Sequence, residues 1–281
     1  MKYVIVNADD FGMHASVNRG IIRAFREGIL TATSLMANGN AFEEAIELSR
    51  HYPALAIGVH LVLVGGDPVS DPRMVPSLVD QHGKLNSDYK TFVKFFLRGG
   101  IQISEVAVEL RKQIEKILSA GIDVSHLDGH QHLHILPGII DRVISLAKEY
   151  KIQWIRSPYD KLNKALTPGN LGLRIFANRA KRKILANNLF TNDNFFGTAY
   201  SGILTESALL KMIKRIPPGV TELMCHPGGG VVEGEDTNPD RRIDRPGELE
   251  ALLSSRVKAA LQEADIVLTN ARKLSEEREV V

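Results

Sequence analysis

The feature that most constrains the fold is an alternation of short apolar runs with segments of helical spacing along most of the chain. This alternation predicts a strand at 3–8, a helix at 16–28, and so on to a last strand at 266–268. The other predicted helices lie at 41–50, 104–119, 138–149, 205–215 and 247–262, and the other predicted strands at 31–36, 55–63, 122–128, 152–155 and 220–225. Apolar strands that alternate with helices are typical of a parallel sheet covered by helices.

The length of the chain favours a barrel over a smaller two-layer fold. The chain has 281 residues, and an α/β barrel typically takes ~250. Two stretches rich in Pro and Gly, 64–103 and 157–200, interrupt the alternation, and the first has some helix near 88–98. Loops of this length are usually functional. We see no internal repeat or low-complexity linker, so we predict an α/β protein: one distorted TIM-like (β/α) barrel domain over 1–281 with long loop insertions.

Composition narrows the classes of function and location. The net charge of +2 gives no reason to expect nucleic acid as a partner. The single cysteine, Cys225, excludes an internal disulfide framework and a cysteine-rich zinc cluster. The apolar run at 1–8 is too short for a signal peptide, and no run reaches the ~18 apolar residues of a membrane span. We expect a cytoplasmic protein or one at the inner membrane surface.

Polar residues stand out where predicted strands end. Asp9 and Asp10 end the first strand, His60 lies late in the third, His130 ends the fourth, and His226 ends a late one. In a (β/α) barrel the carboxyl ends of the strands meet at one face, so these residues would converge. Carboxylate and imidazole together suit zinc or another divalent cation. We predict one divalent metal ion, Mg²⁺ or Zn²⁺, and the residues leave its identity open.

The segment 126–134 holds four of the nine histidines, at 126, 130, 132 and 134. In a strand, every second residue shares a face, so His126, Asp128 and His130 would point the same way. A helix would instead stack the histidines at 126, 130 and 134. Gly129 weakens a helix interior and Pro137 suits the first turn of the next helix. The segment therefore reads as a strand that ends in a metal site.

Four blocks of the sequence resemble the conserved motifs of the YdjC-like carbohydrate deacetylases. They are NADDFG at 7–12, GVHL at 58–61, HLDGHQHLH at 126–134 and CHPG at 225–228. The resemblance runs from residue 3 to about 270, in the order of that family. It implies a distorted (β/α) barrel that removes acetyl groups from N-acetylated amino sugars such as chitooligosaccharides.

The resemblance also implies roles for individual residues. Asp10, His60 and His130 match the metal ligands of the family. Asp9 matches the base that activates water, and His226 matches the histidine that acts as acid or stabilises the oxyanion. On this basis we predict that Asp9 and His226 are catalytic.

Within the family, the chain most resembles the hopanoid-biosynthesis-associated (HpnK-type) subgroup. The blocks 28–36, 60–66 and 75–80 carry that likeness. It implies an N-acetylglucosaminyl hopanoid as the substrate, whereas the block 128–134 equally fits the chitooligosaccharide type. The expected partner is an N-acetylated amino sugar or a glycolipid, and a homo-oligomer stays open.

Further polar residues are predicted to support the site or to contact the substrate. Asp128 would orient a ligand histidine or shape its loop, and Arg156 would orient Asp9, bind substrate or form a surface salt bridge. His126 and His132 would support the ligands or contact substrate, and the role of His134 stays open. Trp154 is expected in the core.

The segment 161–190 carries seven cationic side chains and no acidic one. Its apolar residues Ile175, Phe176, Ala180, Ile184 and Leu185 could form one side of a basic amphipathic helix. Such a helix suits peripheral membrane contact, although a solvated helix face has the same composition.

Two other functions remain open. One is another barrel metallohydrolase, a phosphoesterase or a cyclic-amide hydrolase, because fold does not fix function. The other is a non-catalytic protein that binds sugar or lipid, against which the presence of both Asp9 and His226 argues.

Overall fold

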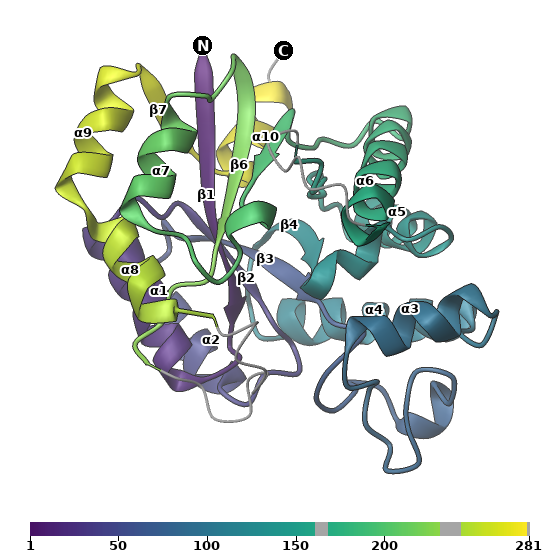
Figure 1. Cartoon of the computed structure of the whole chain (residues 1–281). Coiled ribbons are helices and arrows are strands. Elements are labelled where there is room, and N and C mark those ends of the chain that lie inside the picture. The colour runs from purple at the N-terminus through teal and green to yellow at the C-terminus, as the bar shows by residue number, and fades with distance from the viewer. Residues whose placement is uncertain (161–167, 231–242, 280–281) are drawn as a thin grey trace.

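The predicted alternation of strands and helices is present in the structure, a computed structural model that describes residues 1–160, 168–230 and 243–279 (Figure 1). The strands are β1 (Lys2–Phe11), β2 (Ala32–Leu35), β3 (Ala56–Leu61), β4 (Val124–Gly129), β5 (Asn194–Phe196), β6 (Gly219–Cys225) and β7 (Ile266–Thr269). The helices are α1 (Ala15–Glu27), α2 (Phe42–His51), α3 (Tyr89–Leu97), α4 (Ile103–Ser119), α5 (Ile139–Glu149), α6 (Pro168–Ala186), α7 (Glu206–Ile213), α8 (Arg245–Leu253), α9 (Ser255–Glu263) and α10 (Ala271–Glu279). Short 3-10 helices lie at Pro72–Met74, His130–Ile135 and Thr198–Tyr200.

The strands form one parallel sheet in the order β4-β3-β2-β1-β6-β5, and β7 pairs with the first half of β1. Single parallel bridges, Leu127 with Ile155 and Trp154 with Phe190, continue the pairing beyond β4. The sheet thus curves into a half-barrel with helices around it, α1, α7, α8 and α9 on one side and α4, α5 and α6 on the other (Figure 1). The predicted α/β, TIM-like class is confirmed.

The side chains of β1 alternate between two environments. Val4 and Val6 pack in the main apolar cluster between sheet and helices, whereas Ile5 joins a smaller cluster around Trp154 inside the barrel. Trp154 is 1% exposed, so its predicted place in the core is confirmed. Asn7 lies on the same inward face as Ile5 and is also buried, but its side chain is polar. The barrel interior is therefore apolar at the amino ends of the strands and polar toward their carboxyl ends.

Several elements differ from the prediction. The helix predicted at 247–262 is two helices, because Ser254 is extended and its hydroxyl accepts the N–H of Val257 to cap α9. The strand predicted at 152–155 makes only the two single bridges given above. After Gly129 the strand alternation stops, since Gln131 and His132 are left-handed, with φ of 54° and 57°. The prediction did not include β5 and α10.

The loop after β3 is held in place by hydrogen bonds to side chains of α4. Gln113 accepts the N–H of Val62 at 2.8 Å and donates to its carbonyl at 2.7 Å. Glu109 accepts the N–H groups of Val69 and Ser70 at 2.8 and 2.9 Å. Both α4 side chains are fully buried. The long insertion that follows His60 is therefore anchored at its start.

The basic segment forms α6, but its apolar side is split. Ala180 and Ile184 are buried, whereas Ile175 and Leu185 are 45% and 50% exposed. Lys161 and Lys164 lie outside the described residues. Within the described ranges, no helix is both long enough and apolar enough to pass through a bilayer.

Candidate active site

The two aspartates at the end of β1 face different neighbours because the strand is irregular there. The pairing of β1 with β2 shifts register between Ala8 and Phe11, and Asp10 has a φ of 68°. A left-handed residue in a strand breaks the pleat, and aspartate adopts this conformation more readily than most residues. Asp9 bonds to groups inside the barrel, and Asp10 lies beside two histidines.

Asp10, His60 and His130 come together as predicted from their positions at strand ends. Asp10 Oδ1 lies 3.6 Å from His60 Nε2 and 3.3 Å from His130 Nδ1. One ligand atom from each of the three residues lies within 4.8 Å of the others. Asp10 Oδ1 is buried, and no described group donates a hydrogen bond to it. A buried carboxylate oxygen without a donor is costly unless a cation meets it, so the three residues fit a divalent cation.

The second oxygen of Asp10 contacts a residue that the sequence did not reveal. Arg245 at the start of α8 is 1% exposed, and its guanidinium lies 2.8 Å from Asp10 Oδ2. Burial alone would raise the pKa of Asp10, but Arg245 and His130 hold it well below its ordinary value. Asp10 is therefore an anion in the folded protein.

Asp128 orients His60. Its Oδ1 lies 2.8 Å from His60 Nδ1, and its Oδ2 accepts the hydroxyl of Ser34 at 2.6 Å. Burial lowers the pKa of His60, but Asp128 and Asp9 outweigh it and raise that pKa to about 9. With Nδ1–H directed at Asp128, the His60 Nε2 atom faces Asp10. This arrangement of carboxylate, histidine and metal position is common around bound cations.

Arg156 is fully buried and holds Asp9 with two hydrogen bonds of 2.8 and 2.7 Å. It also lies 2.7 Å from Asp128. Burial raises the pKa of Asp9, but the attraction of Arg156 outweighs it and leaves the pKa below its ordinary value. Asp9, His60 and Asp128 also lie within ligand distance of one another. The guanidinium of Arg156 pairs with both carboxylates of that second group.

Glu222 is a third carboxylate on Arg156 that sequence reasoning missed. It lies in β6 and accepts from Arg156 Nε at 2.6 Å. Its side chain is buried, and this burial raises its pKa to about 7 despite the nearby guanidinium. A single acid inside the apolar run 219–225 was the available signal. An ionisable group in such a run has to find a buried partner.

His226 lies directly after β6, as predicted. Its backbone N–H donates to Glu248 Oε2 at 2.6 Å, and its Nδ1 lies 3.9 Å from the same oxygen. The residue before it, Cys225, pairs with Ala8 of β1, which directly precedes Asp9. His226 and the three candidate ligands therefore lie at the same end of the barrel.

The other three histidines of the segment 126–134 are not among the candidate ligands. His126 packs against Gly58 and bonds to Ser34 at 3.1 Å, and burial lowers its pKa to about 4. His134 Nε2 donates to the Arg156 carbonyl at 3.1 Å, and burial lowers its pKa to about 4.

His132 sits between the other loop histidine and the sheet. Its ring lies edge-on to Phe195 with centroids 5.8 Å apart and edge-on to His134 at 6.4 Å. Burial, and then the charge of Arg156, lower the pKa of His132 to about 3. His132 is therefore neutral and packs between aromatic rings.

Comparison with known proteins identifies the family of the chain and agrees with its fold. The chain matches the YdjC-like protein family over residues 3–263. It is 31% identical over 271 residues to a carbohydrate deacetylase of Thermoanaerobacter pseudethanolicus, covering 96% of this chain and 98% of the relative. It is 30% identical over 281 residues to a chitooligosaccharide deacetylase of Serratia marcescens, covering 97% and 99%.

A solved structure is also similar over nearly its whole length. It comes from Enterococcus faecalis V583, from a protein named for a suggested role in cellobiose-phosphate cleavage. The TM-score is 0.80 at 28% identity, and the match covers 97% of this chain and 98% of the other. The sequence match, the relatives and the shared fold agree, and the chain belongs to the YdjC-like family.

Proposed function

We propose that this protein is a metal-dependent deacetylase that hydrolyses the N-acetyl group of an amino sugar to a free amine and acetate. The observation that carries the proposal is the convergence of Asp10, His60 and His130 beside Asp9, which Arg156 holds in place. The names of the relatives, carbohydrate and chitooligosaccharide deacetylase, support the substrate class.

In this proposal Asp10, His60 and His130 hold one divalent cation. A bound divalent cation polarises a carbonyl oxygen and lowers the pKa of water toward neutrality. The contact of His60 Nδ1 with Asp128, at 2.8 Å, leaves Nε2 as the nitrogen that would lose its proton and bind the cation. The mixed donor set does not select among zinc, magnesium and similar ions.

Asp9 is the proposed general base. Its low pKa keeps it ionised, and two hydrogen bonds from Arg156 and one from Asn7 fix its orientation. Asp9 accepts a proton from the attacking water as the water oxygen bonds to the acetyl carbon. Arg156 offsets the charge of Asp9 before the reaction, and Asp128 and Glu222 offset the charge of Arg156 afterwards.

His226 is the proposed general acid. Glu248 lies on the Nδ1 side of its ring, with its Oε2 atom 3.9 Å from Nδ1. His226 donates its proton to the sugar nitrogen as the C–N bond breaks, which gives a neutral amine and acetic acid, and the acid then loses its proton to solvent to become acetate. Glu248 also accepts the backbone N–H of His226, which holds the main chain at this residue.

The test is acetate release by purified protein with and without chelator. The panel contains chitobiose, free N-acetylglucosamine and an N-acetylglucosaminyl hopanoid. We expect release that stops with chelator and returns with added metal. Release from the hopanoid alone assigns the enzyme to lipid modification, and release from chitobiose assigns it to sugar breakdown. Metal-loaded protein that binds these sugars without releasing acetate contradicts the proposal, and phosphoesterase and cyclic-amide substrates are then the next panel.

A further inference from the structure

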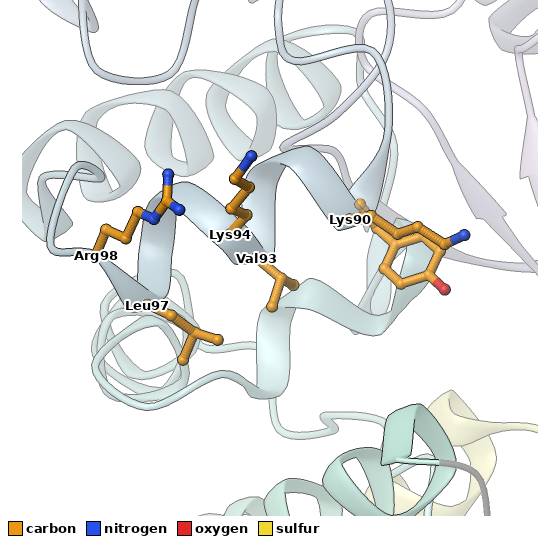
Figure 2. A pocket seen from close by; sticks show the side chains of 6 residues that line it. Lys90, Val93, Lys94, Leu97 and Arg98 are labelled. Atoms are coloured by element: carbon orange, nitrogen blue, oxygen red, sulfur yellow. The ribbon is translucent and has the colours of Figure 1, made fainter.

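Helix α3 exposes cationic and apolar side chains together. Lys90, Lys94 and Arg98 follow one another at a spacing of four residues, and all three are exposed. Leu97 is 72% and Phe95 is 45% exposed. A shallow groove of about 400 Å³ runs along this helix, lined by Tyr89, Lys90, Val93, Lys94, Leu97 and Arg98. Figure 2 shows Lys94 and Arg98 on one side of the helix and Val93 and Leu97 on the other.

The positive charge of α3 is not neutralised within the described part of the chain. No described carboxylate forms an ion pair with Lys90, Lys94 or Arg98, although other surface cations such as Lys183 have such partners. The preceding acid, Asp88, accepts the N–H groups of Lys90 and Thr91 and so caps the helix. Residues 89–98 contain three cations and no acid.

Apolar exposure on this scale also needs a reason. Phe92 anchors α3 to the core with no exposed surface. Leu97 lies in the last turn of the helix beside Val93, and burial of its exposed side chain would stabilise it. A helix that combines unpaired cations with exposed apolar side chains fits the interface of an anionic membrane, where both meet complementary groups.

We propose that α3 docks the protein on the surface of an anionic phospholipid bilayer. Lys90, Lys94 and Arg98 would contact the phosphate headgroups, and Val93 and Leu97, which lie together on the neighbouring side of the helix, would face the apolar boundary beneath them. Helix α3 lies at the edge of the molecule in the insertion that follows β3, the strand that carries His60 (Figure 1). The proposal does not depend on the deacetylase chemistry, and it explains how a lipid-linked sugar would be reached.

Helix α6, the other basic segment, is less suited to this contact. Lys181 donates to the carbonyls of Asn192 and Asp193, and Lys183 pairs with Asp141. These cations stabilise the fold of their own region. Two cations of α6 are thus engaged within the fold, and the three others, Arg174, Arg179 and Arg182, provide the direct comparison for α3.

The first experiment is cosedimentation of the full chain with vesicles. Mixed phosphatidylglycerol and phosphatidylcholine vesicles are compared with phosphatidylcholine alone. We expect binding to the anionic vesicles only, weakened by added salt. The triple variant Lys90→Gln, Lys94→Gln, Arg98→Gln should bind on the order of 100-fold more weakly, from the usual contribution of each cation near an anionic surface. The matched control is Arg174→Gln, Arg179→Gln, Arg182→Gln on α6, which should bind like wild type.

A fluorescence reporter tests the apolar contact separately. The single native tryptophan, Trp154, is buried, so Leu97→Trp adds the only exposed indole. Its emission should shift to the blue with anionic vesicles. Ile175→Trp, at a position on α6 that is 45% exposed, should not shift.

The outcomes separate this proposal from the deacetylase proposal. Acetate release from soluble chitobiose should be the same in wild type and the α3 triple variant. The docking proposal is wrong if wild type ignores anionic vesicles, if the α6 variant loses binding as strongly as the α3 variant, or if the α3 variant changes only the oligomeric state. That last result would make α3 a contact between copies of the chain.

Discussion

At the scale of single residues, Asp9 and Asp10 are neighbours in sequence with separate environments. Arg156 holds Asp9, and Arg245 holds Asp10 beside the two histidines. Replacing Asp9 with Asn keeps the shape of the side chain and removes its ability to accept a proton. We expect kcat of Asp9→Asn to fall by about 100- to 10,000-fold, the usual contribution of a general base, with metal content unchanged. Steady-state kinetics and metal analysis of the same preparation measure both quantities.

Glu222→Gln is the matched control for that prediction. It also removes one negative charge from the surroundings of Arg156, but Glu222 is not among the groups within ligand distance of His60. Its kcat should change far less than that of Asp9→Asn. Equal losses in the two variants would mean that the charge on Arg156, and not a base at Asp9, is what the reaction needs.

Glu222 also makes stability depend on pH. Its pKa rises from an ordinary value of 4.5 to about 7 in the folded protein, because burial outweighs Arg156, with Asp128 and Asp9 nearby. Between these values the folded state keeps a proton that the unfolded chain has lost, so stability falls as pH rises through the window. Relative to Glu222→Gln, wild type should lose roughly 3 kcal/mol across it.

Urea unfolding with chelator present, at the two ends of that pH window, measures this difference. Using the variant as the reference removes the contributions of the buried histidines, which both proteins share. A difference in unfolding free energy that stays constant with pH would show that Glu222 is ionised throughout.

The candidate ligands could be predicted from sequence because each follows a strand, and parallel strands end on one face. The partners of those ligands could not be predicted in the same way. Arg245 lies 235 residues from Asp10 and begins helix α8. Glu222 lies inside β6, where the apolar pattern hides one acid. Such contacts depend on how distant segments come together when the barrel forms, and the local sequence pattern carries no information about that.

At the scale of elements, side chains of α4 hold the start of the insertion after β3 in place. Gln113 satisfies both polar groups of the Val62 backbone, and it is buried. Gln113→Leu keeps a side chain of similar size at this position. It leaves the N–H and the carbonyl of Val62 without their partner. We expect the unfolding free energy to fall by ~2 kcal/mol, the cost of buried unpaired groups. Chemical denaturation measures the change.

Gln262→Leu on the exposed surface of α9 is the control, and it should leave stability within experimental error. If Gln113→Leu is as stable as the control, water replaces the lost hydrogen bonds and the insertion is not held by α4.

Element prediction worked where periodicity was long and failed where tertiary contacts decide. Helix α4 and strand β3 were predicted within a few residues because their apolar spacing is sustained. Strand β5 has three residues, too few for any period, and is defined by its pairing with β6. The hydroxyl of Ser254 divides α8 from α9 inside one continuous helical pattern.

At the scale of the whole molecule, the proposed cation connects three strands. Its ligands follow or end β1, β3 and β4, which are joined through β2. A ligand that binds only the folded state stabilises it, and a hundredfold excess over Kd should raise Tm by roughly 5–10 °C for a chain of this size. Asp10→Ala should abolish the shift. Thermal denaturation with and without metal after chelation measures it.

His51→Ala is the control, because His51 is an exposed histidine on α2. It should show the same metal-dependent shift as wild type. A shift that survives Asp10→Ala would place the stabilising ion at another site.

The irregular end of β1 has a consequence for interpreting relatives. Because Asp10 is in the left-handed conformation, the side chains of two adjacent residues, Asp9 and Asp10, point into different surroundings and can have different roles. A chain that keeps Asp10 and both histidines but has lost the acid at position 9 would still hold a cation and a sugar, and it would have no group to accept a proton. Such a protein would bind sugar as a lectin does although it resembles a hydrolase, and the residue at position 9 would distinguish the two.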